Sequence, residues 1–240
     1  TPARIFAWFP EFVFDDKGNC SRYLYKKEND DGFDPALLHN RNRFASGAIT
    51  YTNTYLSKVL YGNKTPYQTL ADPFPAAADF MFETVFDYGE YNLVAPFEEI
   101  AGWSFRPDAF PAFKSGFEIR TTRLCRRVLL FHHFTELPGG SALVKSLDFA
   151  YDAGPTFTFL TSITSDGFIK RTDGTYTSKS MPPVEFDYQK PDWNKQVKTI
   201  TAENLVHSPA GLADTSYQFT DLFNEGLSGI LSEQGNGWYY

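Results

Sequence analysis

Cysteine is scarce in this sequence, which has two cysteines, Cys20 and Cys125, among 240 residues. Two cysteines cannot build a disulfide framework, and neither lies in the Cys-x-x-Cys spacing that zinc and redox sites use. One bridge between them stays open, but we expect two structural thiols. Neither has an identifiable base partner in the sequence, so the pattern does not favour nucleophilic chemistry at sulfur.

Long apolar runs are also missing. No stretch approaches the roughly 20 apolar residues that span a bilayer, so we expect no direct insertion into a membrane. The first residues, Thr1 to Arg4, contain neither an initiator methionine nor a signal-peptide pattern. The last residues, Gly237 to Tyr240, end inside an aromatic run that is typical of a strand. We therefore expect this chain to be a piece of a longer protein.

Basic residues are fewer than acidic ones, 22 against 29, which gives a formal net charge of −7. This balance argues against an extended nucleic-acid-binding surface. A local exception contains five basic residues and one acid: Lys114, Arg120, Arg123, Arg126, Arg127 and Glu118. This run could bind an acidic partner surface. We favour a structural interpretation, in which the arginines cover the solvated face of a sheet and pair with neighbouring acids.

Two catalytic motifs are absent from the sequence, the Gly-x-Ser-x-Gly nucleophile elbow and the Gly-x-x-x-x-Gly-Lys-[Ser/Thr] phosphate loop. The neighbouring His132 and His133 would point to opposite faces of a strand, so they could not chelate one metal together. Glu185 and Asp187 share one face of a predicted strand and could flank a sugar in a glycoside hydrolase. A solvated edge strand explains these two carboxylates better.

The segment Asp221–Gly226 resembles an acidic calcium loop. Phe223 replaces a ligand at the third position, and Glu225 is a longer residue at the fifth, so we expect a tight turn between two strands instead. Glu98–Glu99 lie in a proline-flanked loop, where acidic side chains are expected without any function. We assign no catalytic, cofactor-binding or metal-binding residue.

Aromatic residues are abundant, since 24 Phe, 14 Tyr and 4 Trp make up 18% of the chain. This content argues against disorder. Alternating aromatic and β-branched residues predict a hairpin around the turn Asp15–Asn19 and many further strands. The further segments are 54–61, 80–88, 143–151, 157–164, 184–188, 216–220 and 229–232. Ten or more strands and no convincing long helix predict an all-β protein.

The longest uninterrupted strand pattern runs from Gly116 to Leu137. Its alternation changes phase around Arg123, which predicts a bulge or kink at that residue. A helix is the competing interpretation because Leu124 and Val128 lie at helical spacing. The flanking β-branched and aromatic residues and the lack of a cap favour one long bent strand.

Long segments of the sequence resemble the B component of bacterial insecticidal Tc toxin complexes, the TcdB/TcaC type, and the related SpvB-like proteins. The segments lie in the same order and are 55–66, 85–90, 106–108, 116–134, 159–164, 182–186, 226–235 and 238–240. The resemblance covers nearly the whole chain. It implies a middle or amino-terminal region of a much larger secreted protein.

In that family the B component joins a C component in a hollow β-shell of RHS/YD-type hairpins, which encloses the toxic carboxy-terminal part of C. A β-propeller of B is the gate and docks on the pentameric A component, whose channel delivers the cargo. The resemblance implies a hairpin-rich shell wall for residues 1–210 and part of a propeller blade for residues 211–240. The family's toxic enzyme, often an ADP-ribosyltransferase, lies outside this region, so we expect a chain that is no enzyme and has no cofactor.

Two alternative functions remain. A carbohydrate-binding β-domain of a secreted protein could use exposed aromatic residues such as Trp103, Trp193 and Trp238. A glycoside hydrolase using Glu185 and Asp187 is the weaker alternative.

Overall fold

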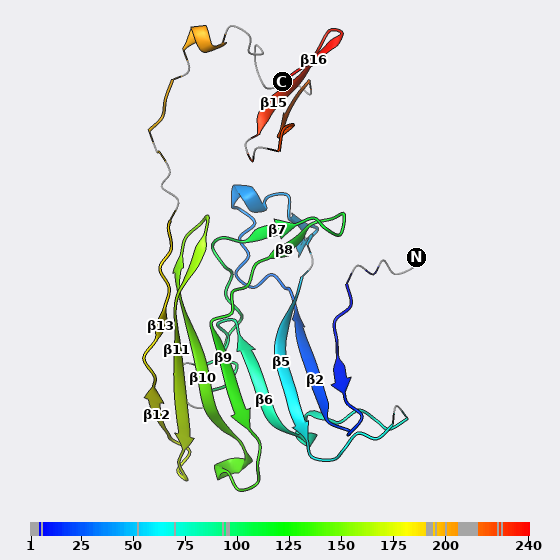
Figure 1. The fold of residues 1–240 in the computed structure, drawn as a ribbon, viewed down its shortest axis with the longest axis vertical. Coiled ribbons are helices and arrows are strands. Elements are labelled where there is room, and N and C mark those ends of the chain that lie inside the picture. Colours follow the sequence, from blue (N-terminus) through cyan, green and yellow to red (C-terminus); the bar gives the residue numbers. More distant parts are fainter. Residues whose placement is uncertain are drawn as a thin grey trace. The chain divides into compact units, whose positions relative to one another are not determined.

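The computed structural model describes residues 5–240 except 6, 52, 70, 93, 95–96, 191–193, 195, 200, 206–215, 225 and 227. The chain divides into two compact units, Thr1–Gln189 and Lys190–Tyr240. Each unit has its own β-sheet (Figure 1). The described residues include no α-helix and four short 3-10 helices, so the all-β prediction is confirmed. None of the helices in the described ranges is long and apolar enough to cross a membrane.

The first unit is built around a nine-stranded antiparallel sheet, which Figure 1 shows as one broad layer. Its strands are β1 (Phe12–Phe14), β2 (Cys20–Lys27), β5 (Thr54–Asn63), β6 (Phe80–Asp87), β9 (Arg127–His132), β10 (Ala142–Ala153), β11 (Thr158–Lys170), β12 (Tyr176–Ser180) and β13 (Val184–Glu185). They lie in the order β1-β2-β5-β6-β9-β10-β11-β12, and β13 also pairs with β11. Since most neighbours in space are neighbours in sequence, the sheet consists largely of successive hairpins.

Shorter elements lie in the loops of the first unit. They are the strand pairs β3 (Phe44–Ala45) with β4 (Ala48–Ile49) and β7 (Phe110–Ala112) with β8 (Ile119–Thr121), and the 3-10 helices η1 (Leu38–Asn40), η2 (Ala77–Asp79) and η3 (Pro138–Gly140). In Figure 1 the β7–β8 pair lies above the upper ends of β2, β5 and β6. The loops therefore add a cap at one end of the layer.

The first hairpin forms because Asp15 organises its turn. Asp15 Oδ1 accepts hydrogen bonds from the backbone N–H groups of Lys17 at 2.9 Å and Asn19 at 2.8 Å. Gly18 completes the turn with φ of +85°, in the left-handed region that favours glycine. β1 then pairs with β2, which confirms the predicted hairpin.

One face of the sheet is buried under loops, and we call it the covered face. The strand register places Leu60 opposite Glu83 and Val85 opposite Leu129. Its central residues are Leu24, Lys58, Leu60, Glu83, Val85, Asp87, Arg127, Leu129, Phe131 and Leu143. From the loop after β6, Tyr91 and Phe97 pack on this face against the cluster of Val85, Leu129 and Leu143. The core of the unit lies between this face and its loops.

The opposite face is apolar but remains half-buried or exposed, and we call it the open face. Its central residues are Tyr23, Val59, Tyr61, Phe82, Thr84, Phe86, Val128, Leu130, His132 and Leu147. Tyr61 stacks on Phe82 with ring centroids 5.1 Å apart, and His132 meets the same ring edge-on at 5.0 Å. At its upper end Phe86 packs against the buried cluster of Tyr55, Tyr88 and Trp103. The rest of this face presents a broad aromatic surface.

The predicted long bent strand from Gly116 to Leu137 is two strands in two different sheets. β8 ends at Thr121 and pairs with β7, whereas β9 begins at Arg127 in the large sheet. The break falls at the predicted position near Arg123. Its form differs from a bulge because the Arg123 side chain turns into the protein, where it is 2% exposed and bound to an acid from another loop.

The second unit contains the 3-10 helix η4 (Ala202–Leu205) and a three-stranded sheet of β14 (Tyr217–Thr220), β15 (Gly229–Gln234) and β16 (Gly237–Tyr239). β14 pairs with β15 in antiparallel orientation, as the predicted turn between these strands requires, and residues 225 and 227 of that turn lie outside the described residues. The predicted domain boundary at 210 lies outside the described residues. It stays a prediction, as does the propeller blade.

Candidate functional site

A buried ion pair joins the loop after β2 to the break between β8 and β9. Arg123 donates to Glu28 Oε1 through its Nε at 2.9 Å and through its terminal nitrogen at 2.5 Å. The two side chains are 0% and 1% exposed. The Thr122 hydroxyl donates to the second Glu28 oxygen. Because both carboxylate oxygens have donors, this buried charge is well compensated.

Trp103 packs against the same guanidinium. The Arg123 carbon centre lies 4.6 Å from the Trp103 ring, a cation–π distance. The indole N–H donates to Asn29 Oδ1 at 2.6 Å, and Arg123 donates to the Trp103 carbonyl at 2.8 Å. Three segments that are far apart in sequence therefore meet at Arg123, and we call this set the arginine anchor: Glu28, Asn29, Trp103, Thr122 and Arg123.

A second buried pair lies where β6 meets β9. Arg127 donates to Asp87 Oδ2 through its Nε at 2.8 Å, and the pair faces the covered side of the sheet. The other Asp87 oxygen accepts the backbone N–H of Gly89 at 2.8 Å. Arg127 also donates to the carbonyls of Tyr91 and Asn92 at 3.1 and 2.9 Å. This pair fixes the start of the loop that covers the sheet.

The covering loop is held at a third point by Lys26. Its Nζ lies 3.5 Å from Glu90 and 3.2 Å from Glu99, and it also lies 4.6 Å from the Trp103 ring centroid. Glu90 is buried, and this burial raises the pKa of its carboxyl above the ordinary value. The loop is thus attached to β2 through a lysine that also contacts the arginine anchor.

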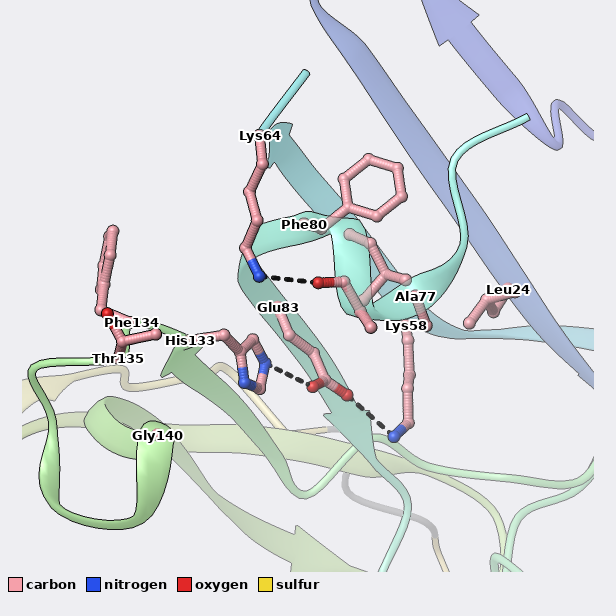
Figure 2. Close-up of a pocket in the computed structure, with 12 residues that line it drawn as sticks. Leu24, Lys58, Lys64, Ala77, Phe80, Glu83, His133, Phe134, Thr135 and Gly140 are labelled. Carbon is pink, nitrogen blue, oxygen red and sulfur yellow. Dashed lines mark hydrogen bonds and ion pairs between the residues drawn. The ribbon is translucent and has the colours of Figure 1, made fainter. Parts of the chain in front are cut away.

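A chain of three charged or polar side chains crosses the covered face in a gap between its loops. Glu83 accepts from Lys58 Nζ at 2.8 Å and lies 2.9 Å from His133 Nε2, as Figure 2 shows. Lys58 lies in β5, Glu83 lies in β6, and His133 directly follows β9. Burial lowers the pKa of Lys58, but its bonds with Glu83 and Tyr91 outweigh this effect and raise it.

Two hollows adjoin this chain and share its three residues. The first, of about 470 Å³, also has apolar walls from Leu24, Leu60, Phe80 and Phe134 and a second lysine, Lys64 (Figure 2). The second, of about 350 Å³, is lined by Tyr91, Phe97, Glu98, Glu99 and Phe131, among others. The arrangement can take up a polar group between apolar walls. In the described part of the chain, no group of three or more His, Cys, Asp or Glu residues could hold a metal ion.

The prediction that the arginines of the run 114–134 cover a solvated sheet face is wrong. Arg120, Arg123 and Arg127 are 5%, 2% and 6% exposed, so they neither cover a solvated face nor offer a surface to an acidic partner. The expected pairing with acids is present, but the acids Glu28 and Asp87 come from distant loops and strands.

The other candidate residues lie apart from one another. His132 is on the open face, and His133 pairs with Glu83. Glu185 ends the short edge strand β13, beyond which Asp187 is also exposed. The structure therefore places these two carboxylates at an exposed sheet edge.

The two cysteines are free thiols. Burial raises the pKa of Cys20, and burial together with the charge of Asp87 raises the pKa of Cys125 to about 12. Both thiols therefore stay protonated at neutral pH, as expected of structural cysteines.

The carbohydrate-binding hypothesis is wrong about Trp103, which is 1% exposed and cannot stack on a sugar. Trp193 lies outside the described residues, and Trp238 is 64% exposed on β16.

In the segment resembling a calcium loop, Asp221 Oδ2 accepts the backbone N–H of Gly226 at 2.7 Å, while Glu225 lies outside the described residues.

Sequence reasoning missed the acids that complete these pairs, Glu28, Glu83 and Asp87, and also Lys58. Glu28 lies in a polar loop where acids are common, so nothing in the neighbouring sequence indicates that its side chain is buried. Glu83 and Asp87 do share a parity within their strand. An alternating acid on an otherwise apolar strand face could have indicated a buried partner.

Comparisons with known proteins agree with this architecture. The family model "SpvB: Salmonella virulence plasmid 65kDa B protein" matches residues 1–134. Among curated proteins, the mono(ADP-ribosyl)transferase SpvB of Salmonella typhimurium is 39% identical over 163 residues, which are 64% of this chain and 26% of that protein. The chain thus spans about a quarter of the length of the curated relatives it matches.

Solved structures extend the similarity to almost the whole chain. The crystal structure of TcdB2-TccC3 is similar with a TM-score of 0.62 and 31% identity over 96% of this chain and 11% of that one. The Photorhabdus luminescens Tc holotoxin pore matches with a TM-score of 0.60 and 30% identity over 95% of this chain and 10% of that one. The N-terminal domain of the Salmonella typhimurium effector SpvB matches with a TM-score of 0.54 and 37% identity over 65% of this chain and 49% of that one.

These findings contradict the prediction that the chain is no enzyme. The curated relatives that share this region are named mono(ADP-ribosyl)transferases. The match to them covers 26% of their length. The names therefore describe whole proteins of which this region is one part.

Proposed function

The chain belongs to the family of the Salmonella virulence plasmid 65kDa B protein, SpvB, and from this membership we propose that it forms a section of the wall of a β-shell in a Tc-type toxin complex. The observation that carries the proposal is the match to TcdB2-TccC3, with 31% identity and a TM-score of 0.62 over 96% of the chain. At this identity and coverage, the likeness extends over both sheets and their loops.

The physical form of the first unit supports a role as one section of a larger wall. Its sheet has one face packed under its own loops and one apolar face that stays half-exposed. Broad exposed apolar surfaces are rare on isolated soluble proteins and mark surfaces that contact other protein. The outer strands β1, β12 and β13 have three, five and two residues, so each edge of the sheet presents short strands to neighbouring chain segments.

The proposal also assigns a more specific role to the wall and one to the second unit. The wall encloses the toxic carboxy-terminal part of a C component, which the similarity to a TcdB2-TccC3 complex supports. The second unit belongs to the gate that docks on an A-component channel, which the sequence resemblance of residues 211–240 supports. Both parts imply a protein that acts outside the bacterium as a member of a toxin complex.

Protease protection of the cargo tests the wall. The full-length protein containing this chain is assembled with its C component, and digestion of the enclosed cargo is followed over time. Leu143→Asp places a charge in the core at a fully buried position and should make the cargo digestible. Ile169→Asp, at a position that is 72% exposed, should leave it protected.

Electron cryomicroscopy of the wild-type complex is the second test, which does not depend on a variant that folds. We expect the nine-stranded sheet within the shell, with its edges paired to other segments. A sheet outside the shell, or a cargo that stays protected in assembled Leu143→Asp complexes, would contradict the proposal.

A second candidate function concerns the whole protein. The 39% identity to the mono(ADP-ribosyl)transferase SpvB favours an ADP-ribosyltransferase activity of the full-length protein that contains this chain. Incubation of that protein with labelled NAD and host-cell extract tests it, and the expected result is a labelled host protein. Extract that stays unlabelled, with an active relative as positive control, would remove this candidate.

A further inference from the structure

The first hollow beside the chain of Lys58, Glu83 and His133 has the size of a small-molecule site. Its volume is about 470 Å³, within the range of roughly 300–1,000 Å³ that such sites occupy. Residues of β5, β6, the 3-10 helix η2 and the segment after β9 surround it (Figure 2). A role in a shell wall makes no use of this hollow.

The apolar part of the lining is packed in place without a ligand. Leu60 and Phe80 are 3% and 1% exposed, and Leu24 packs against the core cluster to which they belong. Phe134, across the hollow, packs edge-on against Phe82 with ring centroids 5.6 Å apart. An apolar group can therefore enter without first ordering these side chains, which favours binding.

The carboxylate in the lining already has two partners. One Glu83 oxygen accepts from Lys58 Nζ at 2.8 Å, and the other lies 2.9 Å from His133 Nε2. The His133 side chain is 29% exposed, so its second ring nitrogen can bind water. The negative charge of Glu83 is thus compensated within the chain.

Lys64 adds a cation that has no carboxylate partner among the described residues. Its Nζ donates to the Ala78 carbonyl at 2.8 Å and forms no ion pair in the described part of the chain (Figure 2). The acids next to lining residues, Asp79 and Glu136, line other hollows. Because an ammonium group carries three hydrogens, two donors of Lys64 remain for a ligand.

These groups favour a carboxylate with an apolar body over other ligands. A carboxylate oxygen is a strong acceptor for the charged N–H groups of Lys64. A cationic ligand would meet two lysines and a Glu83 carboxylate that is already bound. A neutral apolar ligand would cover the Lys64 ammonium without giving it a partner, which costs free energy. A dianionic phosphate would need a second cation without an acidic partner, which the described lining lacks.

We propose that this hollow binds a small apolar monocarboxylic acid. Its carboxylate contacts Lys64 Nζ, and its chain packs against Leu24, Leu60 and Phe134. The site lies within the first unit, so it does not depend on whether the sheet belongs to a toxin shell.

Calorimetric titration of the full-length protein tests the ligand class, with hexanoate as the probe. 1-Hexanol has the same chain without the charge, and acetate has the charge without the chain. Hexanoate should bind saturably and at least about tenfold more tightly than either, since it makes both contacts. Equal affinities for hexanoate and 1-hexanol would overturn the carboxylate contact, and the lack of saturable hexanoate binding up to about 10 mM would overturn the site.

Lys64→Met tests the position of the carboxylate. It keeps an apolar stem, removes the charge and should weaken hexanoate binding about 10–100-fold, the loss of one charge-assisted hydrogen bond. Lys64 is exposed, so the melting temperature should stay unchanged. The matched control is Lys179→Met, at an exposed position of β12, which should bind hexanoate as the wild type does. Equal affinities of Lys64→Met and the wild type, or equal losses in both variants, would overturn the proposal.

A soak of wild-type crystals with 6-bromohexanoate gives a result that requires no variant. Bromine scatters anomalously and marks the end of the chain, so a peak is expected among Leu24, Leu60 and Phe134. An anomalous peak elsewhere on the first unit, or none, would overturn the assignment of the hollow.

Discussion

Removing the charge of Glu28 tests whether the arginine anchor holds the cap on the sheet. Glu28→Gln keeps the size of the side chain and changes one oxygen to an amide nitrogen. Arg123 would then be a buried cation facing a neutral group. The amide would also place N–H donors next to the donors of Arg123 or Thr122.

The expected cost follows from the burial of the pair. The side chains of Arg123 and Glu28 are 0% and 1% exposed, so solvent does not screen the change. Breaking a buried ion pair by removing one partner costs about 3–5 kcal/mol, because the remaining charge stays buried without compensation. We expect Glu28→Gln to lower the free energy of unfolding by this amount.

Urea denaturation, monitored by tryptophan fluorescence, measures this loss of stability. Trp103 is a suitable reporter because it packs on Arg123. The control is Glu99→Gln, whose side chain is 53% exposed and pairs with Lys26. An exposed pair of this kind contributes about 0–1 kcal/mol. The control should therefore unfold almost as the wild type does.

A double variant separates the pair from its surroundings. Glu28→Gln with Arg123→Met removes both charges, so it should lose less stability than the sum of the two single variants. Equal stability of Glu28→Gln and the wild type would refute the reasoning. Strict additivity in the double variant would show that the two residues act independently and would refute it as well.

Three further outcomes are expected. Leu129→Ala, at a position with 0% exposure, should lower the free energy of unfolding by about 2–5 kcal/mol in urea denaturation. Leu130→Ala, on the open face, should lower it clearly less, and equal losses of stability would contradict the assignment of the two faces. Because burial raises the pKa of Glu90, the folded state binds a proton there more tightly, so the contribution of Glu90 to stability should fall as the pH rises above the ordinary glutamate pKa of about 4. The stability of Glu90→Gln relative to the wild type should therefore increase with pH, and a constant difference would contradict the raised pKa. Cys20 and Cys125 should resist a thiol reagent at pH 8 until urea is added, and rapid labelling of the native protein would contradict their raised pKa values.

Local chemistry was sufficient to predict most strands of the large sheet and several of its turns. Asp15 and Gly18 specify the first hairpin within five residues, and the alternation of 80–88 gives β6 almost to its bounds. The all-β class follows from many such local signals. The break near Arg123 was also visible as a change of phase.

The buried pairs could not be predicted because their partners are far apart in sequence. Arg123 alternates with apolar neighbours as a surface arginine would, and only its contact with Glu28, 95 positions away, shows that it is buried. Likewise, Lys58, Glu83 and His133 meet only once the register of three strands is fixed. A single sequence carries no record of that register.

The separation of Glu28 and Arg123 also bears on the order in which the chain can fold as it is made. At about 5–20 residues per second, a ribosome needs roughly 5–20 seconds to add the 95 residues between the two. During that time the Glu28 carboxylate has no cationic partner with which it could be buried, so its loop stays hydrated. Trp103, once synthesised, has no guanidinium to pack against. The cap therefore closes late, and the half-made sheet presents both of its apolar faces to chaperones until Arg123 has left the exit tunnel.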